Sequence, residues 1–153
     1  MKKISMLLLI FVLMLTLTGC GKDVISTKNC TMQNDSYVEI YKITATNDEI
    51  DKVELTIVYD NSMFNVESLD ILDDTQKDQI KTNMLDTLGL ESTTYEGFEI
   101  NIEVEEQMSV NIKADLKLAD TEVLKKVGLD FSNTDMSFER AVKDLEETGA
   151  VCE

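Results

Sequence analysis

The side chains in this sequence that could do covalent chemistry, metal binding or acid–base catalysis are three cysteines and a large excess of carboxylates. The thiols are Cys20, Cys30 and Cys152, and 30 Asp and Glu stand against 14 Lys and Arg. Histidine is absent from the sequence, which excludes a Ser-His-Asp or Cys-His catalytic apparatus within the chain. A carboxylate-pair hydrolase is compatible with the composition, but a solvated acidic surface is the simpler interpretation. We therefore expect no enzymatic activity, no cofactor and no metal.

Cys20 ends a segment with the features of an export signal. Lys2 and Lys3 give a positive start, and residues 4–17 form a 14-residue run that is almost entirely apolar. A membrane-spanning helix needs about 20 apolar residues, so this run is short for a permanent anchor and fits the core of a secretory signal. The alternative is an uncleaved signal anchor, in which Cys20 is an incidental cysteine beside the membrane.

The last four residues of this segment, Leu17-Thr18-Gly19-Cys20, resemble the lipobox of bacterial lipoproteins. The resemblance implies cleavage after Gly19 and a diacylglyceryl group on the Cys20 thiol. Two acyl chains, palmitate for example, are enough for stable anchoring. We therefore expect a signal peptide at 1–19, a lipid-anchored tether at 20–28 and a single α+β domain at 29–153. The mature protein would sit on the extracytoplasmic face of the cell membrane.

The net charge of the mature chain excludes some classes of binding partner. Removal of residues 1–19 leaves 134 residues, enough for one domain with a real core. The removed segment holds two lysines and no acidic residue, so the net charge changes from −16 to −18. A body this negative does not attract nucleic acid or anionic headgroups. We expect contact with the membrane only through Cys20, and no nucleic-acid partner.

Cys30 and Cys152 remain after Cys20 is assigned to the lipid. An exported chain meets a compartment in which disulfides form, and the remaining number is even. A Cys30–Cys152 disulfide would close a loop of 123 residues, which stabilises by roughly 4–5 kcal/mol in the chain-entropy model. The alternative is two unpaired small hydrophobic residues in the core. Two thiolates without histidine are a poor zinc site.

The hydrophobic pattern predicts an antiparallel sheet with helices. Alternating residues predict strands at 29–33, 37–46, 53–59, 98–104 and 108–118, the last two as a hairpin. Helical spacing with caps predicts helices at 75–88, at 121–127 and from Asp135 or Ser137 to Gly149. Residues 60–72 fit either a loop with a helical turn or a further strand. The order, roughly β-β-β-α-β-β-α-α, predicts an α+β fold whose sheet has about five strands, with helices packed on one face.

With this predicted order of strands and helices, the chain resembles the YehR-like family of small bacterial lipoproteins. The resemblance rests on Leu17–Cys20, on the strand pair 37–46 and 49–59 around a short Asn-Asp turn, and on the tail 136–151. Similar members end in a helix, a glycine and a short apolar segment, and some carry a cysteine pair like Cys30 and Cys152. The resemblance implies the fold and the location, and it gives no site residue beyond Cys20.

Two non-catalytic functions follow from these observations. The first is a binding or interaction domain at the cell envelope with an envelope protein as partner, using an apolar patch around Met63, Phe64 and Tyr95, although each of these residues could equally fill the core. The second is an extracytoplasmic small-ligand or cation receptor. Its candidate ligands are two acidic runs, Asp70, Asp73, Asp74 and Asp78, or Glu103, Glu105 and Glu106. Neither run has the spacing of an EF-hand.

Overall fold

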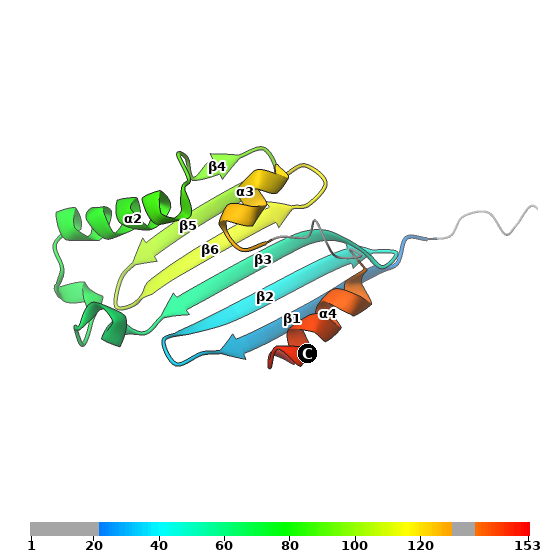
Figure 1. Ribbon diagram of the computed structural model, residues 1–153, viewed down its shortest axis with the longest axis horizontal. Coiled ribbons are helices and arrows are strands. Elements are labelled where there is room, and N and C mark those ends of the chain that lie inside the picture. The colour runs from blue at the N-terminus through cyan, green and yellow to red at the C-terminus, as the bar shows by residue number, and fades with distance from the viewer. Residues whose placement is uncertain (1–21, 130–136) are drawn as a thin grey trace, which may run out of the picture.

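The computed structural model describes residues 22–129 and 137–153, and its main feature is one open, seven-stranded antiparallel sheet (Figure 1). The strands are β1 (Ile25–Gln33), β2 (Tyr37–Thr46), β3 (Glu49–Tyr59), β4 (Thr94–Tyr95), β5 (Phe98–Val104), β6 (Met108–Asp115) and β7 (Val151–Cys152). Their order in the sheet is β4-β5-β6-β3-β2-β1-β7. The expected signal peptide, Cys20 and the candidate helix start Asp135 lie outside the described residues.

The predicted fold class is wrong. We expected an α+β fold with about five strands, whereas the described chain forms mainly a single open sheet of seven strands with three short α-helices. The two strands that the sequence did not predict, β4 and β7, have two residues each. A two-residue strand shows no alternation, and it forms here only because β5 and β1 offer a free edge to pair with.

The first three strands form a long meander with a tight turn between β2 and β3. Asn47 and Asp48 both have positive φ, 54° and 71°, as expected for a two-residue hairpin turn of type I′. β1 begins at Ile25, so residues 25–28 of the expected tether belong to the sheet. Between Thr44 and Ala45 the register of β2 on β3 shifts, and this bulge leaves Asp51 without a strand partner.

The predicted hairpin is formed by β5 and β6. Phe98, Ile100, Ile102 and Val104 are buried, and so are Met108, Val110, Ile112 and Ala114 opposite them. The residues between them point to the other side of the sheet. These side chains, together with those of β3, form the centre of the hydrophobic core.

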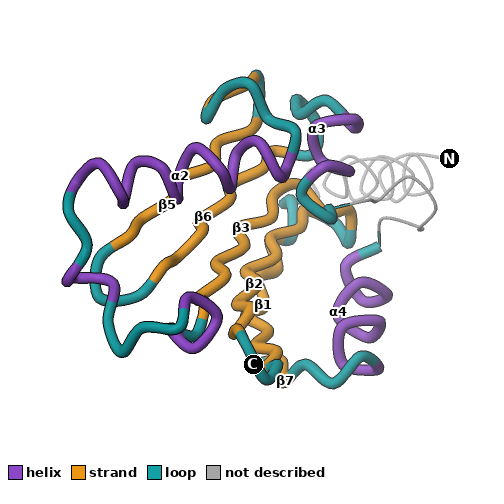
Figure 2. Tube along the Cα trace, turned by 60° about the vertical axis from the view of Figure 1, so that its left-hand side comes forward, coloured by secondary structure: helices purple, strands orange, loops and turns teal. Residues whose placement is uncertain are grey.

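Three α-helices lie in the described part of the chain, and the two longer ones lie along opposite edges of the sheet on the same side (Figure 2). α2 (Asp74–Leu88) packs beside β5, and α4 (Phe138–Glu147) packs beside β1 and β7. α3 (Thr121–Lys126) is the third. Asp73 and Gln76 form a capping box at the start of α2, and Gly89 ends it with φ 65°. None of the described helices is both long enough and apolar enough to cross a membrane.

The segment 60–72 is the loop with helical turns rather than a further strand. It contains two 3₁₀ helices, η1 (Asn61–Phe64) and η2 (Leu69–Ile71), and Leu69 is fully buried. The backbone N–H of Leu69 donates to the carbonyl of Glu106 at 3.0 Å, and the Asn61 side-chain amide donates to the same carbonyl at 2.9 Å. These bonds fix the segment to the β5–β6 turn and close the end of the core.

Candidate functional site

The two faces of the sheet differ in what covers them. We call the face that carries Cys30, Tyr41, Leu55, Ile112 and Ile100 the inner face, because these residues are neighbours across β1, β2, β3, β6 and β5. Apolar residues of all three helices pack against this inner face. The alternate residues of the same strands point to the outer face, and no described helix lies on it.

The outer face is a lattice of polar side chains whose order follows from the strand register. One row across the sheet alternates in charge: Asn29, Lys42, Glu54, Lys113, Glu99 and Thr94. The next row has no charge: Val151, Thr31, Ile40, Thr56, Asn111 and Asn101. The alternation of opposite charges lowers repulsion between neighbouring strands, and the face offers many hydrogen-bonding groups to solvent.

Direct contacts hold part of this lattice in place. The ammonium of Lys42 lies 2.8 Å from the carboxylate of Glu54, and both side chains are about half exposed, at 48% each. The Thr56 hydroxyl donates to the Asn111 side-chain carbonyl at 2.9 Å. The Asn101 amide donates to Glu103 at 2.8 Å. These bonds order the side chains in advance, which lowers the entropy that a ligand must remove on binding.

A hollow of roughly 400 Å³ lies over this lattice where β3, β6 and β5 run side by side. It is lined by Glu54, Thr56, Glu99, Asn101, Glu103, Asn111, Ile112 and Lys113. Three carboxylates and one ammonium give the lining a negative balance. A ligand that fits this chemistry carries positive charge and several hydrogen-bonding groups.

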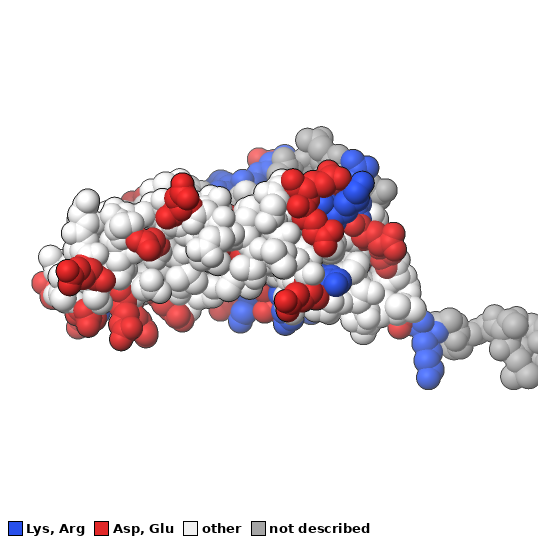
Figure 3. Space-filling view, turned by 90° about the horizontal axis from the view of Figure 1, so that it is seen from below, with Lys and Arg blue, Asp and Glu red and all other residues white. Residues whose placement is uncertain are grey.

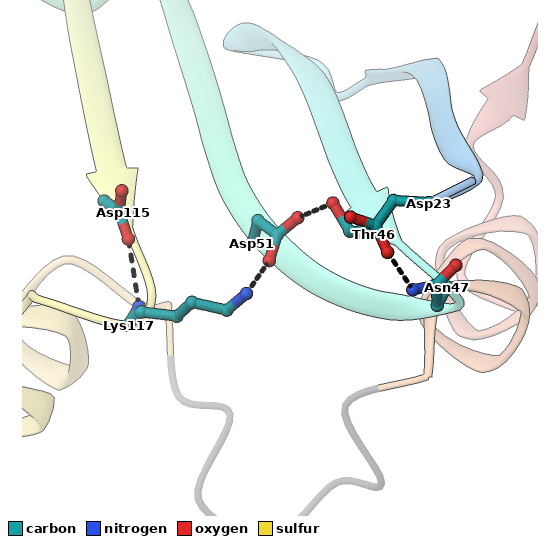
Figure 4. A network of polar contacts seen from close by, with 6 residues as sticks. All are labelled: Asp23, Thr46, Asn47, Asp51, Asp115 and Lys117. Carbon is teal, nitrogen blue, oxygen red and sulfur yellow. Dashed lines mark hydrogen bonds and ion pairs between the residues drawn. The ribbon is translucent and has the colours of Figure 1, made fainter. Parts of the chain in front are cut away.

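The end of the sheet nearest to residue 22 is tied together by a polar network (Figure 4). Asp51, the bulge residue, forms an ion pair with the Lys117 ammonium and accepts a hydrogen bond from the Thr46 hydroxyl. The Lys117 contact, followed by the Thr46 bond, lowers the pKa of Asp51, and Asp51 in turn raises the pKa of Lys117. Nearby, the Asn47 amide donates to Asp23 at 2.9 Å. The bonds of Asn47 to Asp23 and to the backbone N–H of Val24 hold the residues before β1 against the β2–β3 turn.

The disulfide that we considered for Cys30 and Cys152 is present in the structure. The two cysteines are directly opposite each other in β1 and β7, and Cys30 is fully buried. The bond joins segments 122 positions apart in the sequence. It fastens the short C-terminal strand β7 to the edge of the sheet.

The two acidic runs proposed as cation ligands lie near the same end of the molecule, away from the N-terminal segment. They come from residues 70–78 and from the end of β5 with the turn that follows it, and all seven side chains are exposed. Acidic side chains gather at this end in Figure 3, at the left. The Asp73 carboxylate already caps α2, where it accepts a hydrogen bond from the backbone N–H of Gln76. In the described ranges no group of three or more Cys, Asp or Glu side chains converges closely enough to hold a metal ion.

The expected apolar patch is not assembled. Phe64 lies in η1 and Tyr95 lies in β4, at opposite ends of the sheet, and both pack against the core. The Tyr95 ring contacts the Phe98 ring edge-on, with centroids 6.0 Å apart. Met63 is half exposed, at 50%. The hollow over Asn101 and its neighbours was not predicted, because it depends on the order of the strands rather than on a motif.

Comparisons with known proteins support the fold. No protein-family model matches the chain, and no curated protein matches it. Solved structures that are similar include the NMR structure of the E. coli YehR protein, with a TM-score of 0.63 and 12% identity over 86% of this chain and 93% of that chain. The NMR structure of a protein from Streptococcus pneumoniae TIGR4 has a TM-score of 0.49 and 11% identity over 88% of each chain. The chain therefore has a YehR-like fold.

Proposed function

We propose that this chain is a lipid-anchored bacterial lipoprotein of the YehR-like family, and that it serves as a non-catalytic binding domain at the cell envelope. Three observations support the envelope location. They are the Leu17–Cys20 motif after a short apolar run, the disulfide between Cys30 and Cys152, which is typical of exported proteins, and the YehR-like fold.

The observation that carries the binding function is the hollow on the outer face, on which no described helix lies. A sheet face that only needs to be soluble requires scattered charges, whereas this one has a cavity lined by eight residues from three adjacent strands. Its negative lining favours a basic ligand, and the strongly acidic chain attracts such a ligand from a distance. The occupant that we propose is a Lys- or Arg-bearing segment of another envelope protein.

The anchor is tested by replacing Cys20 with Ala in the full-length protein in its bacterial host. We expect the variant to lose labelling by radioactive palmitate and to leave the membrane fraction. Normal processing and unchanged membrane attachment of the variant would contradict the lipid anchor.

The binding surface is tested with two charge-matched triple variants of the full-length protein, compared by in-cell crosslinking. In the first, Glu54, Glu99 and Glu103 of the hollow become Gln. In the second, which is the control, Asp86, Glu139 and Glu146 of α2 and α4 become their amides; all three are exposed and lie outside the hollow. We expect only the first variant to lose the crosslinked partner. Equal loss in both variants would indicate attraction by net charge alone and would contradict a specific site on the outer face.

A further inference from the structure

Three tyrosines and one carboxylate lie close together on the inner face, the side of the sheet opposite to the hollow. Tyr37, Glu39 and Tyr41 alternate along β2 and point inward, and Tyr59 of β3 lies opposite Tyr37. The rings of Tyr37 and Tyr59 are 6.0 Å apart and tilted by 49°. All four side chains are only partly buried, so a solute can reach them.

Glu39 is unusual for its position. Its neighbours across the sheet are Met32 and Ile57, and among the paired residues of β1, β2, β3, β5 and β6 it is the only acidic one that the register places on the inner face. An ionised carboxylate among apolar groups is costly unless it is compensated. No ion pair among the described residues involves Glu39.

The compensation within the described residues is one neutral hydrogen bond. The Tyr41 hydroxyl donates to Glu39 Oε2 at 2.9 Å. Burial first, and then this bond, raise the pKa of Tyr41 above its ordinary value. The hydroxyl is a neutral donor, so this bond brings no positive charge to Glu39.

The spacing of the residues along β2 suits a cation above the carboxylate. Alternate residues of a strand are about 6.6 Å apart on one face, so a cation on Glu39 has Tyr37 on one side and Tyr41 on the other. A cation placed there would have a tyrosine on each side along β2, and an aromatic face attracts a cation within about 6 Å of the ring centre. Tyr59 extends the aromatic wall beside Tyr37.

We propose that Tyr37, Glu39, Tyr41 and Tyr59 form a binding site for a quaternary ammonium group. A methylated ammonium is bulky and weakly hydrated, so it loses less solvation between aromatic rings than a lysine ammonium or a metal ion does. The carboxylate supplies the opposite charge. The site lies on the inner face, so it does not depend on the function proposed for the outer face.

The tyrosine content of the chain allows ligand binding to be measured by intrinsic fluorescence. The chain has four tyrosines and no tryptophan, and three of the four tyrosines belong to this site. A Tyr95→Phe background therefore makes intrinsic tyrosine fluorescence a reporter of the site alone. The full-length protein in a non-ionic detergent is titrated with choline chloride at constant ionic strength. The neutral isostere 3,3-dimethylbutan-1-ol, which has the same shape without the charge, is the matched ligand control.

We expect a saturable fluorescence change with choline and none with the isostere. Glu39→Gln should weaken choline binding about tenfold or more, and Tyr37→Leu about threefold. Tyr41→Phe keeps the ring and should retain binding. Glu54→Gln is the control, because it removes one carboxylate from the outer face. Circular dichroism of each variant verifies that it is folded. If Glu39→Gln does not fold, Tyr37→Leu still tests the site.

Either of two results with choline would overturn the proposal: no saturable change up to about 50 mM choline, or equal weakening by Glu39→Gln and Glu54→Gln. Binding of the neutral isostere with the affinity of choline would show a simple apolar contact and would overturn it as well. A parallel titration with glycerophosphocholine identifies the source of the ligand. Tighter binding of this compound than of choline assigns the site to a lipid-derived headgroup, and the reverse order assigns it to a free ammonium compound.

Discussion

The two faces of the sheet are made by alternate residues of the same strands, yet the two faces are under different packing constraints. On β5, Ile100 is 1% exposed and packs in the core, while its neighbour Asn101 is exposed and lines the hollow. The inner face is specified by packing, because each side chain must exclude water and fill volume. The outer face is free of this constraint, so an ordered polar lattice there is more informative about function.

The disulfide is expected to contribute the largest single stabilisation, and it acts from the inner face. Replacing both Cys30 and Cys152 with Ala should lower the free energy of unfolding by roughly 4 kcal/mol, since it releases a loop of 123 residues in the unfolded chain. The next pair along the same two strands, Thr31 and Val151, faces outward and is the control. Its double Ala variant should change stability by less than about 1 kcal/mol. Urea unfolding of the unmodified protein and the two double variants under oxidising conditions measures both effects, and a similar loss in both variants would contradict the contrast.

The contrast between faces is tested most simply on β5. Ile100→Ala should destabilise the fold by about 3 kcal/mol, because it leaves a cavity in the centre of the core. Asn101→Ala on the same strand should change the unfolding free energy by only about 0.5 kcal/mol. Chemical denaturation of both variants measures the two changes in unfolding free energy. A large loss for Asn101→Ala would show that the outer face is also part of a packed interface.

A smaller effect of the inner face appears at high pH. Burial raises the pKa of Tyr41 and of Tyr59 in the folded protein. Each tyrosine has a higher pKa in the folded protein than in the unfolded chain, where the pKa is about 10. Its contribution to the free energy of unfolding is therefore complete below pH 10 and is lost as the pH rises above that value. Stability should therefore fall above pH 10, and this fall should be shallower in Tyr41→Phe. Urea midpoints between pH 9 and about 11.5 give the two slopes. Parallel slopes would mean that Tyr41 does not titrate with unfolding.

The smallest effect is expected for the ion pair of the outer face. Lys42 and Glu54 are each 48% exposed, so their interaction should be worth only about 0.2–1 kcal/mol and should weaken with salt. A double-mutant cycle with Lys42→Met and Glu54→Gln measures the coupling. A coupling above about 2 kcal/mol would show that the pair is shielded from water and would weaken the description of this face as open.

Sequence patterns predicted the parts of this fold that are long and regular. The β5–β6 hairpin, the Asn47–Asp48 turn and the capped helix after Asp73 all follow from local alternation, turn chemistry and caps. The seven-stranded sheet did not follow, because β4 and β7 exist only through pairing with distant partners.

The candidate sites were harder to predict for a related reason. The hollow joins Glu54 to Glu99 and Asn101, which are far apart in sequence and meet only through the order β5-β6-β3. Local evidence for the tyrosine site was present: β2 places Tyr37, Glu39 and Tyr41 on one face, and a carboxylate between two aromatic residues in such a pattern is a signal that a search for motifs overlooks.

The central claim, that the outer face contacts a partner, is tested most directly by a photo-reactive amino acid placed at Asn101 in the full-length protein in living cells. Asn83 on α2 is the matched control, since it is also an exposed asparagine but lies outside the hollow. We predict that a protein adduct forms from position 101, is absent from position 83, and disappears when Glu54, Glu99 and Glu103 are neutralised. Adducts of equal intensity from both positions, or none from position 101, would contradict the claim.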